Sequence, residues 1–184
     1  MEPELADSLL KVARAAVTAV VNGQRPATID HPDPRLLGRQ GAFVTLRTHG
    51  QLRGCIGQFI ADKPLIEVVQ DRAVAAATQD PRFFDNRLRL EELDDLHIEV
   101  SVLSPLERIE NPLDLALGIH GIFIARGGQA GCFLPQVATE TGWSKEEFLS
   151  YCCSHKAGLP PNAWRNPETE VHIFTADIIA EPEK

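Results

Sequence analysis

Residues 42–59 read AFVTLRTHGQLRGCIGQF and carry the strongest indication of the fold. Residues 42–47 are rich in the apolar, β-branched and aromatic side chains that favour a strand. His49-Gly50 then offers a tight turn, and residues 52–59 can return as the second strand of a hairpin. That strand carries Cys55, flanked by Gly54 and Gly57. We therefore expect an antiparallel hairpin with the cysteine on its second strand.

Helical and strand patterns share the rest of the chain. Apolar residues at helical spacing predict helices over residues 5–20 and 65–77, and a capping box at Ser144-Glu147 predicts a third helix that ends near Gly158. Strict alternation predicts a strand over residues 97–103, and shorter patterns predict strands over 121–126, 131–134 and 170–179. Hairpins joined by helices favour an α+β fold with a largely antiparallel sheet and helices packed on it.

Length and charge exclude several classes of protein. A chain of 184 residues fits one domain, or one domain with a small satellite. Its formal net charge of −8 disfavours non-specific binding to nucleic acid or to anionic membranes. The apolar runs are too short for a spanning helix, and the N-terminus is acidic where a signal peptide is basic. We expect a cytoplasmic protein whose four cysteines are reduced thiols.

Cys55 admits a functional and a structural interpretation. The glycines at positions 54 and 57 let another backbone or a ligand approach closely, and Arg53 shares the face of Cys55 in a regular strand. A nearby cation favours the thiolate, which is the reactive form of cysteine. Alternatively, Cys55 is a small buried hydrophobic residue in a tightly packed strand.

Two further residues are candidates for a site with Cys55. His120 lies between Gly118 and Gly121, where an imidazole can be held rigidly beside a cleft or can bond the backbone of its own turn. Glu99 lies in the middle of the strand over residues 97–103. It is either a catalytic carboxylate or simple polar patterning on a solvated sheet face. In the catalytic interpretation Cys55 is the nucleophile, His120 the base and Glu99 the group that orients it.

Cofactor and metal signatures are absent from the sequence. It contains no H-E-x-x-H, no C-x-x-C pair and no glycine-rich phosphate loop. No metal site is expected, and no cofactor is identified.

Residues 52–57 read LRGCIG and resemble the signature hexapeptide of the AMMECR-type domain family. Other blocks of that family follow in the expected order between about residues 5 and 180: Ala42–Leu46, Asp80–Phe83, Ile98–Pro105, Gly118–Ile122, Leu134–Ala138, Trp143-Ser144 and Lys156–Leu159. The resemblance implies a single AMMECR-type domain over residues 1–184, made of a larger α+β subdomain and a smaller α/β subdomain packed together.

The resemblance also implies partner proteins, but it implies no established reaction. Chains of this kind resemble the protein A component of the AmmeMemoRadiSam system, which implies a Memo-type protein and a radical SAM protein as partners. The first hypothesis is an enzyme or enzyme component with a cleft at Cys55, in which Arg53, Gly54, Gly57 and Ser101 are candidate binding residues. The alternative is a non-catalytic interaction module. A third, an RNA- or nucleotide-binding domain, is disfavoured by the acidic charge.

Overall fold

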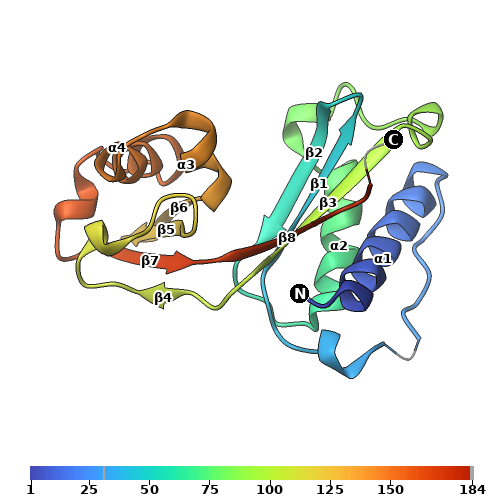
Figure 1. The fold of residues 1–184 in the computed structure, drawn as a ribbon. Coiled ribbons are helices and arrows are strands. Elements are labelled where there is room, and N and C mark those ends of the chain that lie inside the picture. Colours follow the sequence, from blue (N-terminus) through green and yellow to red (C-terminus); the bar gives the residue numbers. More distant parts are fainter. Residues whose placement is uncertain (31, 183–184) are drawn as a thin grey trace. The chain divides into compact units, whose positions relative to one another are not determined.

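The computed structural model describes residues 1–30 and 32–182, and the chain divides into two compact units (Figure 1). Unit 1 comprises Met1–Leu103 and the C-terminal segment from Asp177, and unit 2 comprises Ser104–Ala176. Each unit has its own four-stranded antiparallel sheet with helices, which confirms the α+β class. No helix in the described ranges is long and apolar enough to span a bilayer.

Unit 1 is a sheet with strand order β2-β1-β3-β8, and two long helices pack on one of its faces (Figure 1). The elements are α1 (Pro3–Val21), β1 (Ala42–Thr48), β2 (Gln51–Gln58), α2 (Leu65–Thr78), β3 (Leu96–Leu103) and β8 (Ala176–Ala180). Short 3₁₀ turns at η1 (Pro34–Leu36), η2 (Pro81–Phe83) and η3 (Leu90–Glu92) lie in the connections.

The core of unit 1 follows from two periodicities. Alternate residues of β1 and β3 point to the helices, and these are the apolar ones: Ala42, Val44, Leu46, Ile98, Val100 and Val102. Helical spacing on α1 brings a matching stripe to them: Leu5, Leu9, Ala13, Ala16 and Val17. Because only one face of the sheet is covered by α1 and α2, the intervening residues of each strand belong to the opposite face, which we call the open face.

The β1–β2 hairpin forms as the sequence predicts, with one irregularity. His49 and Gly50 both have positive φ, 49° and 72°, as a two-residue hairpin turn with right-handed twist requires. The pairing begins with Thr48 opposite Gln51, but a β-bulge between Leu46 and Arg47 shifts the register by one residue. The shift sets which face every later residue of β2 occupies.

Unit 2 is a second sheet, with strand order β4-β7-β5-β6. Its elements are β4 (Glu107–Arg108), η4 (Pro112–Asp114), β5 (Gly121–Arg126), β6 (Gln129–Phe133), α3 (Pro135–Thr141), α4 (Lys145–Tyr151), a π-helical turn η5 (Cys152–Lys156), η6 (Ala163–Arg165) and β7 (Glu170–Phe174). The predicted capping box opens α4, where the Ser144 and Glu147 side chains each accept the other's backbone N–H. The β5–β6 hairpin turns at Gly127-Gly128, as expected.

The predicted last strand over residues 170–179 is two strands. β7 pairs with β4 and β5 in unit 2, whereas β8 is an edge strand of the sheet in unit 1. Thr175, between them, bonds Ser104 through its backbone N–H and C=O. The pattern of β-branched residues continues through this point, so the sequence shows no break where the pairing partner changes.

Candidate functional site on the open face of unit 1

Cys55 lies on the open face, in register with two polar residues. Cys55 of β2 stands opposite Thr45 of β1, and Thr45 stands opposite Glu99 of β3. Residues that face one another across neighbouring strands project to the same side of a sheet. Val44, adjacent to Thr45, is fully buried beneath the helices, so this row of three side chains projects away from them. The structure thus places Cys55 and Glu99 on the same face of the sheet, two strands apart with Thr45 between them, and their joint role in a site stays a prediction.

The thiol of Cys55 has a hydroxyl neighbour. Thr45 Oγ1 lies 3.3 Å from Cys55 Sγ and is within hydrogen-bonding reach of it. The backbone N–H and C=O of Cys55 point away from β1, so Cys55 and Thr45 form a non-hydrogen-bonded pair, in which the Cα atoms are about 4.5 Å apart and side chains are closest. Thr45 is 8% exposed and the thiol is half-buried. Across both strands, Cys55 and Glu99 are about 10 Å apart at Cα.

An aspartate–arginine pair covers the outer edge of β2 at Cys55. Asp80 Oδ2 accepts the Cys55 backbone N–H at 2.8 Å, and Arg82 Nη2 donates to the Cys55 carbonyl at 3.3 Å. The two side chains bond each other at 2.9 and 2.6 Å, and Asp80 is only 3% exposed. The pair thus takes the place of a neighbouring strand and shields an edge that would otherwise attract another chain.

The charges of this edge pair are mutually stabilised. Hydrogen bonds from Arg82 hold the pKa of Asp80 below its usual value despite burial. The pKa of Arg82 is raised, chiefly by Asp80, with a smaller contribution from the charge of Cys55. Arg82 is therefore the cation that interacts with Cys55, although the sequence pointed to Arg53.

The side chain of Arg53 binds a different set of groups. At the bulge it has no opposite residue in β1, and its guanidinium binds Glu92 at 2.8 and 2.9 Å and the carbonyl of Arg87 at 3.1 Å. Burial alone would raise the pKa of Glu92, but hydrogen bonds from Arg53 and from the Arg89 N–H outweigh it and the pKa is lowered. The ring of Phe83 packs against this guanidinium, with its centroid 5.9 Å away.

Both glycines beside Cys55 are required by close packing within the protein. A Cβ on Gly54 would lie 2.1 Å from the carbonyl oxygen of Ala76, because α2 crosses directly over this point of β2. A Cβ on Gly57 would lie 2.2 Å from the ring of Phe43, which occupies that space on the open face. Ser101 is the third member of the Phe43 row and is fully buried. Backbone and aromatic ring, rather than a ligand, fill these spaces.

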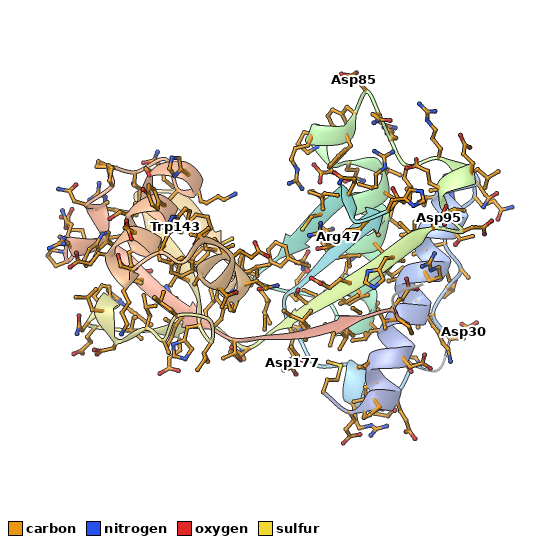
Figure 2. The ribbon with its side chains drawn as sticks, turned by 45° about the horizontal axis from the view of Figure 1, so that its top comes forward. Asp30, Arg47, Asp85, Asp95, Trp143 and Asp177 are labelled. Carbon is orange, nitrogen blue, oxygen red and sulfur yellow. The ribbon has the colours of Figure 1, made fainter. Side chains whose placement is uncertain are left out.

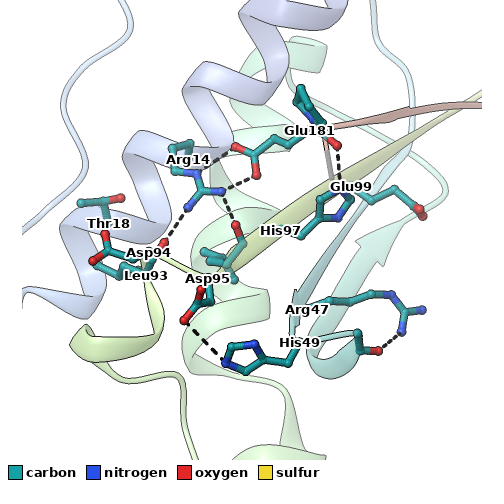
Figure 3. A pocket seen from close by; sticks show the side chains of 13 residues that line it. Arg14, Thr18, Arg47, His49, Leu93, Asp94, Asp95, His97, Glu99 and Glu181 are labelled. Carbon is teal, nitrogen blue, oxygen red and sulfur yellow. Dashed lines mark hydrogen bonds and ion pairs between the residues drawn. The ribbon is translucent and has the colours of Figure 1, made fainter. Parts of the chain in front are cut away.

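Glu99 links the Cys55 row to a cavity of about 1080 Å³ (Figure 3). The residues that line it come from α1, β1, the β1–β2 turn, the segment before β3, β3 itself and the C-terminal segment: Arg14, Thr18, Arg47, His49, Gly50, Leu93, Asp94, Asp95, Leu96, His97, Glu99, Glu181 and Pro182. All of them belong to unit 1. Glu99 is half-buried, and among the described residues it has neither a hydrogen-bond nor an ion-pair partner through its side chain.

One wall of the cavity is formed by the contacts of Arg14, which together we call the clasp. Its guanidinium binds both carboxylate oxygens of Glu181 and the carbonyls of Leu93 and Leu96. The carbonyl of Glu181 lies 2.6 Å from Nε2 of His97, and its carboxylate accepts the N–H of Ile98. These contacts fix the C-terminal segment to β3 and leave this wall without free charge.

His120 lies in unit 2, whereas Cys55 and Glu99 lie in unit 1. Its Nδ1 accepts the backbone N–H of Ala116 at 3.1 Å across the turn that precedes β5. This bond matches the alternative in which His120 serves its own turn. The predicted role of His120 as a base stays a prediction.

Two of the other three cysteines differ from Cys55, whereas Cys132 is also half-buried. Cys152 and Cys153 are fully buried in unit 2, and burial raises the pKa of both thiols. Over the described ranges, no three histidine, cysteine or carboxylate side chains gather in a way that could hold a metal ion.

Comparison with known proteins places the chain in a family. The model of the AMMECR1 family matches residues 10–179. A protein of Methanothermobacter thermautotrophicus is 44% identical over 181 residues, which cover 95% of this chain and 93% of the relative. Protein MK0488 of Methanopyrus kandleri is 40% identical, with 98% and 90% covered. The crystal structure of uncharacterized protein PH0010 from Pyrococcus horikoshii superposes with a TM-score of 0.90 at 38% identity, covering 100% of this chain and 94% of that one. The chain belongs to the AMMECR1 family.

Proposed function

We propose that this AMMECR1-family chain is an enzyme or an enzyme component whose site is the row Cys55–Thr45–Glu99 on the open face of unit 1. The observation that carries the proposal is the alignment of a half-buried thiol, a hydroxyl and an unpartnered carboxylate across three adjacent strands. Strands hold side chains more rigidly than loops, so the three groups keep a fixed spacing for a bound substrate.

The row suits acyl transfer by a thiol nucleophile. Cys55 Sγ forms a bond to a carbonyl carbon, the bond to the leaving group breaks, and the leaving group departs with that electron pair. The Thr45 hydroxyl can accept the thiol proton and pass its own through a bridging water or substrate group to Glu99, which then returns a proton to the leaving group. Water or a second acceptor then attacks the thioester carbonyl, takes the acyl group from sulfur and restores the thiol. Arg82, which binds the Cys55 carbonyl, and the Thr45 hydroxyl are both groups that attract negative charge on sulfur.

Site-resolved alkylation tests the proposal. The native protein is treated with iodoacetamide, and each cysteine is quantified by peptide mass spectrometry, with fully buried Cys152 as the internal unreactive standard. We expect Cys55 to react and the rate to change in Thr45→Val but not in Thr139→Val, a threonine in unit 2. If Cys55 is as inert as Cys152, or if Thr45→Val leaves its rate unchanged, the proposed site is wrong.

A second candidate function, a protein-interaction module, is supported by exposed apolar side chains on unit 1. Ile60, Phe84 and Leu90 are 79, 53 and 56% exposed on the connections that flank β2 and α2. Large exposed apolar side chains often mark binding surfaces. The partners implied by the family resemblance, a Memo-type and a radical SAM protein, are the ones to test. Micromolar binding that Phe84→Ser weakens would support this function, and the absence of binding to both proteins would oppose it.

A further inference from the structure

The cavity beside Glu99 has an unusual balance of charge. Its lining holds four carboxylates, Asp94, Asp95, Glu99 and Glu181, against two guanidinium groups. Arg14 and Glu181 neutralise each other in the clasp, and Asp95 Oδ2 lies 3.5 Å from Nε2 of His49.

Two opposite charges in the lining are left without an opposite charge as partner. Arg47 is exposed, and its guanidinium contacts only the carbonyl of Gly50, at 3.4 Å, among the described residues. Glu99 has no partner through its side chain within the same ranges. In Figure 3 the two side chains extend to the same side of the sheet, and no contact joins them. Among the described residues, the cavity therefore presents the Arg47 guanidinium and the Glu99 carboxylate, neither of them in an ion pair, to the same volume.

The strands set the spacing of the two backbone positions that carry these charges. Arg47 stands opposite His97, and Glu99 follows His97 by two residues on β3, so Arg47 and Glu99 are diagonal neighbours on the open face. Diagonal pairs have Cα atoms about 7–8 Å apart. Figure 2 shows Arg47 and Asp95 labelled in this part of unit 1.

We infer that this cavity binds a free α-amino acid or a close zwitterionic analogue, with its ammonium group on Glu99 and its carboxylate on Arg47. In an α-amino acid, the amine nitrogen and the carboxylate carbon are about 2.5 Å apart. With a charge-assisted hydrogen bond of about 2.8 Å at each end, the ligand spans roughly 8 Å between the two protein groups. The Arg47 and Glu99 side chains are long and rotatable and project from diagonal positions on one face of the sheet, so their charged ends can take up this separation.

Other ligand classes fit less well. Phosphate esters carry two negative charges, and the lining has twice as many carboxylates as guanidinium groups. A metal ion has no suitable ligand group among the described residues. A zwitterion carries one positive and one negative charge, so it can pair with both Glu99 and Arg47 and adds no net charge to the cavity.

The inference deepens the proposed function and rests on it for the identity of the site, since Glu99 belongs both to the Cys55 row and to the cavity lining. An amino acid held by Glu99 would lie next to the row, with its carboxyl end toward Arg47. The substrate class of the Cys55 site is then an amino acid or a derivative of one. Binding itself needs no chemistry at sulfur.

The test measures binding to the full chain by saturation-transfer NMR, followed by isothermal titration calorimetry. The twenty L-amino acids are screened first. The tightest one is then compared with its two matched analogues, the amine that lacks the carboxylate and the acid that lacks the amine, and with inorganic phosphate. We expect at least one amino acid to saturate the protein, and both analogues to bind about 10- to 100-fold more weakly, because each loses one charge-assisted contact.

Variants assign the binding to the cavity. Glu99→Gln and Arg47→Gln should each weaken binding about 10- to 100-fold. The matched controls Glu107→Gln and Arg39→Gln, at exposed positions outside the cavity, should leave it unchanged. Unaltered far-UV circular dichroism and melting temperature show that the variants are folded.

Several results would overturn the inference. They are no saturation by any amino acid at about 10 mM, equal binding of either single-charge analogue, preferential binding of phosphate, or binding that neither cavity variant weakens. Two measurements separate the inference from the proposed function: alkylation of Cys55 in the unmodified chain, and amino-acid binding to Cys55→Ser, which lacks the thiol but keeps every residue of the cavity lining. Amino-acid binding that persists beside an inert Cys55 supports the cavity and refutes the nucleophile. A reactive Cys55 without amino-acid binding does the reverse.

Discussion

Gly54→Ala is the substitution that most sharply tests how the hairpin meets α2. The added Cβ would lie 2.1 Å from the carbonyl oxygen and 2.9 Å from the carbonyl carbon of Ala76. Ordinary contacts at such a position are 3.4–4 Å. The atoms in the way belong to the backbone of a helix, so no side chain can rotate aside. Either β2 or α2 must move by more than 1 Å.

The free-energy cost of Gly54→Ala comes from the packing contacts between α2 and the sheet that this movement would loosen. Ala73, Ala76 and Ala77 are buried on α2, and these small residues let the helix approach the sheet closely. A gap of 0.5–1 Å forfeits about a quarter to a half of each dispersion contact across it. Overpacking of a well-filled core costs about 1–3 kcal/mol. We expect Gly54→Ala to lower the free energy of unfolding by about 3 kcal/mol, the upper end of that range.

Urea denaturation followed by far-UV circular dichroism measures the effect, because α1 and α2 contribute most of the helix in the chain. Both tryptophans, Trp143 and Trp164, lie in unit 2, so their fluorescence monitors that unit separately. The expected shift in the urea midpoint is roughly 1–2 M. The control is Gly38→Ala, whose Cβ meets its nearest neighbour at 3.7 Å. A Gly54→Ala protein as stable as this control would refute the close approach of β2 and α2.

Three further substitutions test the surroundings of the site and the second unit. Asp80→Asn should lower the free energy of unfolding by about 2 kcal/mol at pH 7; because the folded-state pKa of Asp80 is lowered, the difference from wild type should shrink as the pH falls below about 4. Arg53→Met should cost about 2 kcal/mol in urea denaturation and should raise the pKa of Glu92 in an NMR titration. Ser144→Ala should cost about 1 kcal/mol, read from tryptophan emission in unit 2. No pH dependence for the first, no pKa change for the second, or wild-type stability for the third would contradict the contacts described.

Much of the fold can be predicted from local sequence. The turn at His49-Gly50, the alternation of Ile98, Val100 and Val102, and the capping box at Ser144 each act through neighbouring residues, and each forms where its pattern lies. The change of pairing at Thr175 has no local signal, because β7 and β8 share one pattern but belong to different sheets.

The candidate site depends on a feature that the sequence pattern does not show. A regular hairpin turning at His49-Gly50 would place Cys55 opposite Val44, on the helix-covered face. The bulge next to Arg53 shifts the register, so that Cys55 stands opposite Thr45 and projects from the open face. Thr45 was therefore not predicted as a site residue.

Two other site residues were missed because they act through distant backbone. Asp80 and Arg82 follow α2 in a segment whose proline signals only the end of a helix. Their contact with the edge of β2 is a tertiary one, over 25 and 27 positions in the sequence. The Asp80-Pro81-Arg82 sequence, with opposite charges two residues apart just after a helix end, is the signal that could have suggested a paired group.

The reactivity of Cys55 is measured most directly by its alkylation rate in the native protein, divided by the rate of the same cysteine in urea-unfolded protein at the same pH. We expect a ratio of about one or more, because the half-buried thiol on the open face is accessible and has Thr45 and Arg82 as neighbours that attract a negative sulfur. A ratio as low as that of the buried Cys152, whose thiol is kept protonated by burial, would contradict it and leave Cys55 a packing residue.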